Sequence, residues 1–552
     1  MLDELVETMS TMFGSLVSSF FLLNLAAATR GTSPAWNALN STVGGRLQVG
    51  VPLAQPCFSL LNGGAPNVPN PTECSDIQTN YENHIFRSDH FGAYEIIQWE
   101  TCQTTGDECL LDWTNATNPQ AFAPPAQCRQ GSISNYYIDV TGPSDVIAAF
   151  TFSKSDQVPL VIKNTGHDYI GRSAAPGSLA LWTHHLDKLV LNRTFVPTGC
   201  SGNPTTAITV GAGQQFETVY AFAAANNVTV VAGADPGVGL SGGWVMGGGH
   251  GGLSPSMGLG VDRVLEFKIV TPDGQYRIAN KCQNTDLFFA LRGGGGGTFG
   301  VVIESTHIAS PQVTVQAVQW QMASDGWGGY ITWHMGQPNL NSTAAQQSAA
   351  GAVEAFASVG GTTTFFVMDS YTEFYDTFIA SNTDASGRPQ VLASRLIPAD
   401  KFTDETLIDS LVDGVVSSEF GQILSVAPFA FKDFDNGTSI NPAWRTAVWH
   451  SLISYYWNFN STLSERVGLY NKLEQQWAVV RQRTPGAAVY FNEADVYEPN
   501  YIDAYWGATN YAKLLAIKQK YDPNHLLRLL ELRRLERSSR SSLQVLPKHY
   551  CG

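Results

Sequence analysis

Residues 158–173 carry the strongest chemical signal in the chain and read V-P-L-V-I-K-N-T-G-H-D-Y-I-G-R-S. The apolar, β-branched run 158–162 predicts a buried strand, and the Asn-Thr-Gly that follows predicts a tight turn with His167 at its tip. Such a turn can present consecutive backbone N–H groups to phosphate oxygens without a lysine. The imidazole could ligate a metal, act as a base or bond covalently to a cofactor. An ordinary strand and turn with a hydrogen-bonded histidine is the alternative.

Two further glycine-rich stretches follow predicted strands. Residues 242–252 read G-G-W-V-M-G-G-G-H-G-G, and residues 292–300 read R-G-G-G-G-G-T-F-G. Residues 237–242 also match G-x-G-x-x-G, with Asp262 at the acidic spacing of a nicotinamide site. That alternative requires the turn to open a helix, and seven glycines among the eleven residues 242–252 disfavour one. Three glycine-rich turns instead predict an extended cofactor held by backbone along its length.

Composition and charge indicate a large globular protein. The chain has 552 residues, of which 43% are hydrophobic and 14% charged, enough to bury a large core in two or more domains. Its net charge of −15 would repel nucleic acid and anionic membranes. No later run is long and apolar enough to span a membrane. We therefore expect a small-molecule partner, and neither nucleic acid nor a membrane.

The N-terminus and the cysteines predict an exported protein. Residues 1–28 resemble a signal-like leader, although their start is acidic; translation from Met12 would give a more ordinary signal, and a buried helix is the alternative. Five of the eight cysteines lie within residues 57–128, which predicts local disulfides; Cys102 and Cys109 close the easiest loop, but spacing does not fix the pairing. Glycosylation sequons also favour secretion and stand at Asn40, Asn115, Asn192, Asn227, Asn341, Asn436 and Asn460.

Short strands with a few helices up to about residue 311 predict an α+β fold rather than a doubly wound sheet. Helical spacing predicts helices over residues 144–153, 214–226, 463–482 and 510–521, and V-Y-F-N-E-A-D predicts a strand over 489–495. Residues 29–130 form a Cys-rich, loop-rich segment. Residues 312–484 have more aromatic side chains and longer helices, which predicts a second domain.

Together, the three loops resemble the flavoprotein oxidases of the vanillyl-alcohol oxidase superfamily, specifically the berberine-bridge-enzyme-like branch and its fungal isoamyl-alcohol-oxidase-like members. N-T-G-H-D-Y-x-G-R-S is specific to this branch, and the resemblance covers residues 136–311 strongly and 490–523 well. It implies a two-domain α+β fold: a PCMH-type FAD-binding domain over residues 131–311, a substrate domain built on an antiparallel sheet over 312–484, and a return to the FAD domain over 485–527.

The resemblance also implies roles for individual residues. His167 matches the histidine that bonds the flavin 8α-methyl carbon. The other matches belong to the FAD loops: Asn164, Thr165, Gly166 and Asp168 around the pyrophosphate, Gly242, Gly243, Gly247, Gly248 and Gly249 in the second loop, and Gly300 and Val301 near the adenine end.

Two features depart from this family. Many relatives carry a cysteine in the second loop that bonds flavin C6, but the corresponding residue here is Asp235 or Pro236, so we expect a single covalent link, through His167. Asp235 could adjust the flavin potential or be merely solvated. Residues 528–552 lack the usual Gly/Trp-containing end and resemble read-through or a misjoined exon, with a basic surface helix as the alternative.

For catalysis, the resemblance implies hydride transfer from a substrate carbon to flavin N5 while a base takes a hydroxyl or amine proton. Tyr490 and Asn492 match the Y-x-N motif beside the flavin, Glu493 replaces a frequent second tyrosine, and His250 lies where plant relatives have an active-site tyrosine. Tyr490, Glu493 and His250 are all candidate bases. Ordinary strand packing is the alternative for Tyr490 and Glu493.

The resemblance implies an oxidase of an alcohol-like or carbohydrate-like small molecule, with O2 as acceptor and H2O2 as product. A pathway oxidase that forms a ring or double bond in a secondary metabolite is one alternative, and a non-catalytic flavin-binding relative is another. No metal is predicted. Neither the substrate nor the oligomeric state can be read from the sequence.

Overall fold

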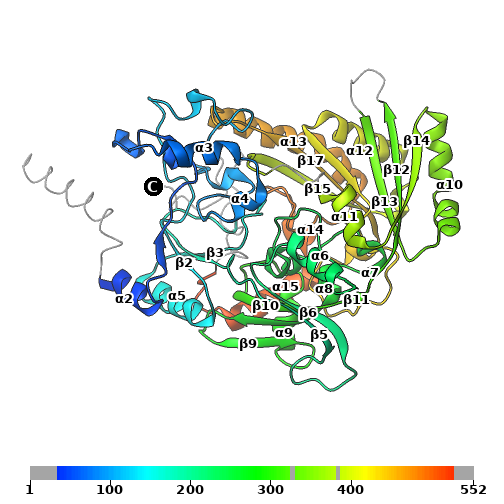
Figure 1. Ribbon diagram of the computed structural model, residues 1–552, viewed down its shortest axis with the longest axis horizontal. Coiled ribbons are helices and arrows are strands. Elements are labelled where there is room, and N and C mark those ends of the chain that lie inside the picture. Colours follow the sequence, from blue (N-terminus) through cyan, green and yellow to red (C-terminus); the bar gives the residue numbers. More distant parts are fainter. Residues whose placement is uncertain (1–33, 324–329, 381–385, 528–552) are drawn as a thin grey trace, which may run out of the picture.

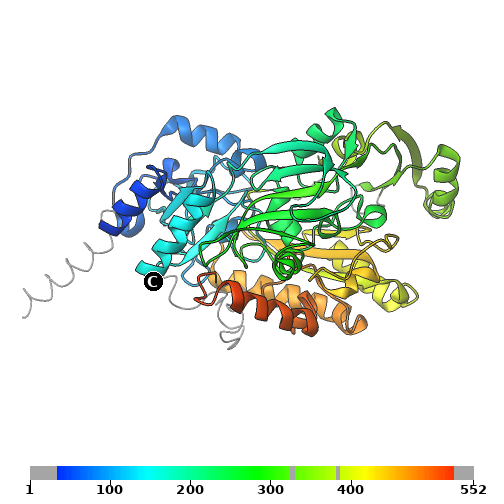
Figure 2. The same ribbon diagram turned by 90° about the horizontal axis from the view of Figure 1, so that it is seen from below.

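The computed structural model describes residues 34–323, 330–380 and 386–527. The predicted leader, residues 1–28, and the arginine-rich residues 528–552 lie outside these ranges. Figures 1 and 2 place the Cys-rich segment (blue) at one end of the molecule and the β12–β14 sheet with helix α10 at the other. None of the helices in the described ranges is long and apolar enough to cross a membrane.

The first sheet carries the strand before His167. Its order is β1-β2-β4-β3, comprising β1 (Leu47–Val49), β2 (Tyr136–Asp139), β4 (Leu179–Trp182) and β3 (Leu160–Lys163). Both β2 and β3 run parallel to β4, while β1 is antiparallel to β2. A parallel arrangement needs a crossover, and α5 (Pro143–Asp156) supplies it, as predicted over 144–153. Side chains of α5 and α2 (Pro34–Thr42), including Trp36 and Phe150, belong to the core beneath this sheet.

The second sheet is antiparallel and holds the other glycine-rich loops at its strand ends. Its order is β5 (Leu189–Phe195), β6 (Thr205–Gly211), β10 (Val301–Ile308), β8 (Val264–Val270) and β9 (Tyr276–Asn280). Helix α6 (Phe216–Ala225) confirms the helix predicted over 214–226 and buries Phe216, Val219, Tyr220 and Ala223. The remaining elements are β7 (Val228–Thr229), β11 (Ser310–Pro311), α7 (Ser254–Met257), α8 (Gly260–Arg263) and α9 (Thr285–Leu291).

Residues 312–484 contain two three-stranded antiparallel sheets flanked by helices. One has the order β13 (Tyr330–Pro338), β12 (Val315–Ala323), β14 (Thr362–Met368), and the other β15 (Gln390–Pro398), β17 (Ala447–Tyr456), β16 (Phe420–Leu424). The helices are α10 (Ser342–Ser358), α11 (Tyr371–Phe378), α12 (Glu405–Ser417) and α13 (Leu463–Arg483). Helix α13 confirms the prediction over 463–482 and buries Trp477 in the core that also contains side chains of β15 and β17.

The strand predicted over residues 489–495 is wrong. This segment is a loop with a turn, in which the Glu493 N–H donates to the Tyr490 carbonyl at 3.0 Å. Its apolar side chains are buried on successive positions instead of alternating ones, because the segment is enclosed by several elements; they are Val489, Tyr490, Phe491 and Ala494. Helices α14 (Tyr501–Tyr505) and α15 (Ala508–Tyr521) follow, the latter as predicted over 510–521. Lys520 of α15 pairs with Asp286 of α9 at 2.6 Å.

The Cys-rich segment is cross-linked by local disulfides, as predicted, and the structure supplies the pairing that the spacing left open. Cys57 bonds Cys74, and Cys109 bonds Cys128 instead of Cys102. The chain at Cys128 runs beside residues 60 and 61, where the Cys128 N–H donates to the Leu60 carbonyl at 2.9 Å. Helices α3 (Pro71–Thr79) and α4 (His84–Ser88) lie in this segment. A third disulfide, Cys200–Cys282, lies near the end of β9.

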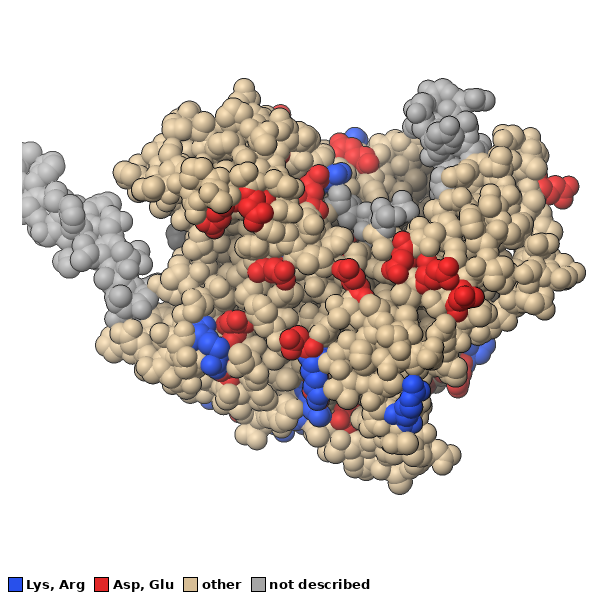
Figure 3. Space-filling model, viewed as in Figure 1, with Lys and Arg blue, Asp and Glu red and all other residues tan. Residues whose placement is uncertain are grey.

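Acidic side chains are spread over the face of the molecule drawn in Figure 3 and do not gather in one patch. On the face drawn in Figure 3, acidic side chains are scattered from one end to the other, and lysines and arginines stand in separated groups among them. This agrees with the net charge of −15.

Candidate active site

The His167 turn is built by the end of β3. The chain leaves the sheet after Lys163, and Gly166 adopts a φ of +103°, which favours glycine. A Cβ on Gly166 would lie 3.3 Å from the Tyr94 Cα of the Cys-rich segment, so the close approach also requires glycine. His167 is part of the wall of a cavity. The turn is as the sequence predicts, and the structure adds that its imidazole lines a cavity.

Asp168 organises the backbone that follows His167. Its carboxylate accepts hydrogen bonds from the Ser173 N–H at 2.7 Å, the Ser173 hydroxyl at 2.8 Å and the Arg172 N–H. Nε of Arg172 lies 3.4 Å from the same carboxylate, which orients the guanidinium, while its buried Nη1 has no hydrogen-bond partner. Arg172 also lines the cavity. An unsatisfied guanidinium donor there fits an anionic group such as a pyrophosphate.

The Cys-rich segment clamps this turn from outside. Nζ of Lys163 donates to the carbonyls of His90 at 3.0 Å and Phe91 at 2.9 Å. The Tyr94 hydroxyl donates to the Ser173 carbonyl at 2.8 Å, and the Glu95 N–H donates to the Gly166 carbonyl at 3.2 Å. Burial lowers the pKa of Lys163 to about 7, despite the opposing effect of Glu95 and Glu100.

Both other glycine-rich loops reach the same cavity. The predicted residues that line it are Asn164, Thr165, Gly166, His167, Asp168, Gly242, Gly243 and Gly300. A Cβ on Gly296 would lie 2.8 Å from the Gly243 Cα, so the second and third loops approach backbone to backbone. The buried Oδ1 of Asn164 has no hydrogen-bond partner. Such loops and unsatisfied polar atoms fit a long cofactor bound largely through the main chain.

Four predicted cofactor residues do not line this cavity. Gly247 lies against Asn492, since its Cβ would be 2.4 Å from the Asn492 amide nitrogen, and Gly248 lies against Tyr490. Gly249 packs on the Trp244 ring. Val301 is fully buried at the start of β10, and its neighbour Val302 lines the cavity in its place. Gly247–Gly249 therefore join the cavity wall to the Y-x-N segment.

The nicotinamide alternative does not hold. Residues 240–244 form only a short helical turn that is broken at Gly242, instead of a long helix after the glycines. Asp262 is engaged elsewhere, because its two carboxylate oxygens pair with Arg445 at 2.7 Å each. It therefore joins α8 to the 312–484 region.

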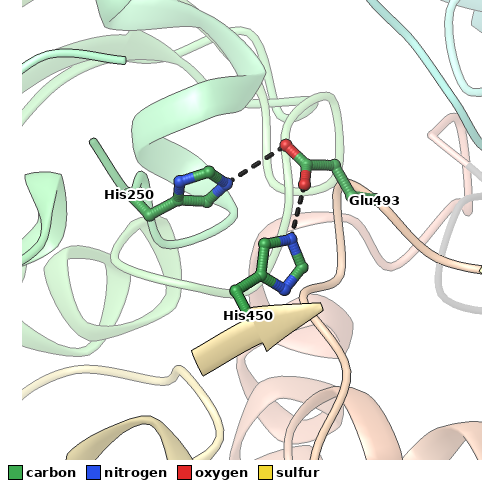
Figure 4. A group of neighbouring side chains, drawn as sticks. All are labelled: His250, His450 and Glu493. Atoms are coloured by element: carbon green, nitrogen blue, oxygen red, sulfur yellow. Dashed lines mark hydrogen bonds and ion pairs between the residues drawn. The ribbon is translucent and has the colours of Figure 1, made fainter. Parts of the chain in front are cut away.

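The predicted catalytic residues come together next to the second loop. The Asn492 amide donates to the Gly243 carbonyl at 2.9 Å and to the Tyr490 hydroxyl oxygen at 2.7 Å. The rings of Tyr490 and His250 have centroids 4.9 Å apart. Glu493 contacts two imidazoles (Figure 4): Nε2 of His250 at 3.2 Å and Nε2 of His450 at 2.6 Å. His450 was not predicted.

Burial and hydrogen bonding set the protonation of this cluster. Burial raises the pKa of Glu493, but the two imidazoles more than offset it, so the net pKa is well below the ordinary value and the group is a carboxylate. Burial lowers the pKa of His450 although Glu493 opposes this, which favours a neutral ring donating its Nε2–H. Burial raises the pKa of Tyr490 well above 10, so the phenol is protonated.

His250, His450 and Glu493 could also hold a metal ion, because their ligand atoms lie within 4.8 Å of one another. Two ligand atoms of a tetrahedral zinc ion, with bonds of about 2.0 Å, stand about 3.3 Å apart. The His450–Glu493 separation of 2.6 Å is instead that of a direct hydrogen bond. We interpret the cluster as hydrogen-bonded.

Comparisons with known proteins agree with this site. The family model described as "FAD binding domain" matches residues 135–280, and the one described as "Berberine and berberine like" matches 489–530. The "FAD-linked oxidoreductase ffsJ" of Aspergillus flavipes is 36% identical over 92% of this chain and 93% of its own length.

The chain belongs to the berberine-bridge-enzyme-like FAD-linked oxidoreductases. It is also 30% identical to the "Bifunctional decalin synthase calF" of Penicillium decumbens, over 90% of this chain and 89% of that protein. The crystal structure of the VAO-type flavoprotein MtVAO615 from Myceliophthora thermophila C1 matches with a TM-score of 0.76 and 26% identity, over 90% of this chain and 93% of that one. The two-domain α+β FAD fold is thereby confirmed, and the protein is an FAD-linked oxidoreductase.

Sequence reasoning missed several residues of this oxidoreductase's site. His450 lies in the middle of β17, far in sequence from any motif, and no local signal marks it. Arg172 and Ser173 stand inside the quoted motif and could have been assigned from it. The other cavity-lining residues that were not predicted include Thr183, Ala212, Ser241, Trp244, Met246, Gly296 and Gly297.

Proposed function

We propose that this FAD-linked oxidoreductase is an oxidase in which His167 bonds the flavin covalently and the His250–Glu493–His450 cluster takes the substrate proton. One observation carries the proposal. Gly243 lines the cavity that His167 also lines, and its carbonyl accepts the Asn492 hydrogen bond at 2.9 Å. The loop that would carry the cofactor is therefore fastened to the segment that carries the candidate base.

FAD, when bound, supplies a hydride acceptor that passes its electrons to O2 and yields H2O2. This chain's residues bind and orient it. The backbone of the three loops and the guanidinium of Arg172 would hold the pyrophosphate, and Asn164 would accept a hydrogen bond through its unsatisfied Oδ1. Thr165, Gly166, Asp168, Gly242 and Gly300 would form the surrounding backbone cradle.

Glu493 is the member of the cluster best placed to contact a substrate. Its side chain is 21% exposed, compared with 10% for His250 and none for His450. It is a carboxylate at neutral pH, so it can accept a hydrogen bond from a substrate hydroxyl. We propose that the hydroxyl proton passes into the cluster through the hydrogen bonds that join Glu493 to the two imidazoles. Tyr490 is protonated and fully buried. We therefore assign Tyr490 and Asn492 to orienting roles.

An alcohol-like or carbohydrate-like small molecule is the proposed substrate class, because a proton-accepting cluster fastened to the cavity-lining Gly243 through Asn492 suits removal of a hydroxyl proton. The relative named a bifunctional decalin synthase favours a second candidate, in which the same hydride removal forms a ring or a double bond. Both candidates use the same residues.

Passage through the secretory pathway is also proposed. The disulfides seen within the described residues, Cys57–Cys74, Cys109–Cys128 and Cys200–Cys282, are compatible with an oxidising compartment. Six of the seven sequon asparagines are exposed and the seventh, Asn40, is half-buried; the exposed ones are Asn115, Asn192, Asn227, Asn341, Asn436 and Asn460. Treatment of the protein from a eukaryotic host with an N-glycosidase should increase its gel mobility, and an unchanged band would contradict glycosylation.

Acid precipitation tests the covalent link. Wild-type protein should keep its yellow colour in the pellet, whereas His167→Ala should release its flavin into the supernatant.

A screen of alcohols and sugars coupled to peroxide detection should then find turnover that depends on Glu493. Glu354→Gln, an exposed change on α10, is the matched control. Colourless wild-type protein, or bound flavin without peroxide formation on any substrate that reduces it, would overturn the oxidase proposal.

A further inference from the structure

We propose that Asp235 is the residue that prepares His167 for covalent attachment of the flavin, by holding the Nε2–H tautomer and stabilising the ring as it is alkylated through Nδ1. This inference rests on the proposed function, since it presumes the covalent histidyl link. It would also give a role to Asp235 at the place in the second loop where many relatives carry the cysteine that bonds flavin C6.

The geometry places the two side chains face to face. Oδ1 of Asp235 lies 3.5 Å from Nε2 of His167, and the side chains are only 16% and 12% exposed. Nε2 is buried and has no hydrogen-bond partner. The distance is at the outer limit of a hydrogen bond, and catalytic contacts of this kind commonly shorten when the reacting partner binds.

The Asp235 carboxylate is held in position by its own loop. Oδ1 accepts the Gly237 N–H at 2.8 Å, and the Asp235 carbonyl accepts the Val238 N–H at 3.2 Å. A Cβ on Gly237 would lie 2.9 Å from Nε2 of His167 and 3.3 Å from Oδ1 of Asp235. Only glycine at this position lets the carboxylate and the imidazole come together.

The surroundings leave Asp235 as the anion that acts on this ring. Glu95 also interacts with Asp235, but burial raises the pKa of Glu95 to about 8. Arg87 opposes this rise and Asp235 adds to it. Glu95 is therefore largely protonated at neutral pH. His84 from α4 also interacts electrostatically with His167, and Lys163 interacts with Glu95. Burial lowers the pKa of His167; Asp235 opposes this lowering and His84 adds to it. The lowered pKa favours the neutral ring, which is the form that can act as a nucleophile.

The proposed step balances as follows. The flavin 8α-methyl carbon loses one hydrogen as a proton, and Nδ1 of His167 forms the new N–C bond to that carbon. The electron pair of the broken C–H bond enters the isoalloxazine, which is thereby reduced by two electrons. The alkylated imidazole gives its Nε2 proton to Asp235. This proton and the one lost from the methyl carbon are the two protons that, with the two electrons of the reduced flavin, convert O2 to H2O2. A carboxylate that fixes a histidine tautomer and stabilises the imidazolium acts in the same way in hydrolase triads.

The test measures covalent and non-covalent flavin separately. Full-length protein produced under riboflavin limitation would be incubated with FAD, and the covalent fraction followed over time by acid precipitation and by the mass of the His167 peptide. We expect Asp235→Ala to bind FAD but to attach it at least about a hundredfold more slowly, and Asp235→Asn, which keeps an acceptor oxygen without the charge, about tenfold more slowly. Formate should partly restore the rate in Asp235→Ala, which a purely structural role does not predict.

Asp409→Asn, an exposed change on α12, is the control and should attach flavin at the wild-type rate. Wild-type attachment rates in Asp235→Ala would overturn the role of Asp235 and leave the covalent oxidase intact. Wild-type protein whose bound FAD is released entirely by acid would overturn the covalent link and this inference with it. A bond found at Nε2 in the peptide would also refute the assigned geometry.

Discussion

Replacement of Glu95 by glutamine should remove a large part of the protein's sensitivity to alkaline pH. Glu95 is fully buried beneath the His167 turn, where its backbone N–H donates to the Gly166 carbonyl. Burial raises its pKa from the ordinary value of 4.5 to about 8, although Arg87 and Lys163 oppose this. The folded protein therefore keeps a proton that the unfolded chain loses above pH 4.5.

The sign and the size follow from linkage. The stabilisation by this proton is fully present below pH 4.5 and is lost as the pH rises through about 8. Over the roughly 3.5 pH units between these values, at 1.36 kcal/mol per unit, the loss is about 5 kcal/mol. A chain of 552 residues has an unfolding entropy near 1.2 kcal/mol/K, so the expected change in Tm is about 4 °C.

The assay is the Tm of wild type, Glu95→Gln and the exposed control Glu354→Gln at pH 5 and pH 8. Because pH 5 lies above 4.5 and pH 8 is the midpoint of the native-state titration, this interval captures about 3.5 kcal/mol of the loss. Wild type and the control should therefore lose about 3 °C more than Glu95→Gln. The buried carboxyls of Glu108 and Glu498, whose pKa values burial raises to about 7, titrate in all three proteins and cancel in the comparison. Parallel pH profiles for wild type and Glu95→Gln would show that Glu95 is already ionised in the fold.

Three further outcomes are expected. Gly296→Ala should lower the FAD content of purified protein severalfold, because its Cβ would stand 2.8 Å from the Gly243 Cα, whereas Gly351→Ala, with open space around it, should keep full content; equal contents would contradict the close approach of the loops. Glu493→Gln should slow flavin reduction by a reactive substrate by about 10²–10⁴-fold without loss of flavin, and a wild-type rate would exclude it as the base. Dialysis against EDTA should leave turnover and Tm unchanged; a loss restored by zinc would replace the hydrogen-bonded interpretation of His450 with a metal site.

The parts of the fold that the sequence predicts are those with local patterns. Helix α6 follows from the spacing of Phe216, Val219, Tyr220 and Ala223, and these side chains form its buried face. The His167 turn follows from a short apolar run and an Asn-Thr-Gly. The strand expected over 489–495 fails because apolar composition alone does not separate a strand from a loop enclosed on all sides.

His450 illustrates what local patterns miss. It lies on β17 among serines and apolar residues, where a buried histidine is unremarkable in sequence. Its function depends on Glu493, 43 residues away, whose carboxylate it contacts at 2.6 Å. Only the fold brings the strand and the loop together. The same reason explains the Cys109–Cys128 pairing, since chain path and not loop length decides which cysteines meet.

The Cys-rich segment carries more of the site than its composition suggests. Lys163 ends an apolar run, yet its ammonium is fully buried against the rings of Phe91, Tyr94 and Trp182 and donates to two carbonyls of that segment. A buried cation needs such partners, so β3 cannot end where it does without residues 90–95. The same residues support Gly166 and place Glu95 beside the His167 turn. The cross-linked residues 57–128 thus support the His167 turn from outside, and loss of the Cys109–Cys128 bond should destabilise this turn before it destabilises the more distant β12–β14 sheet.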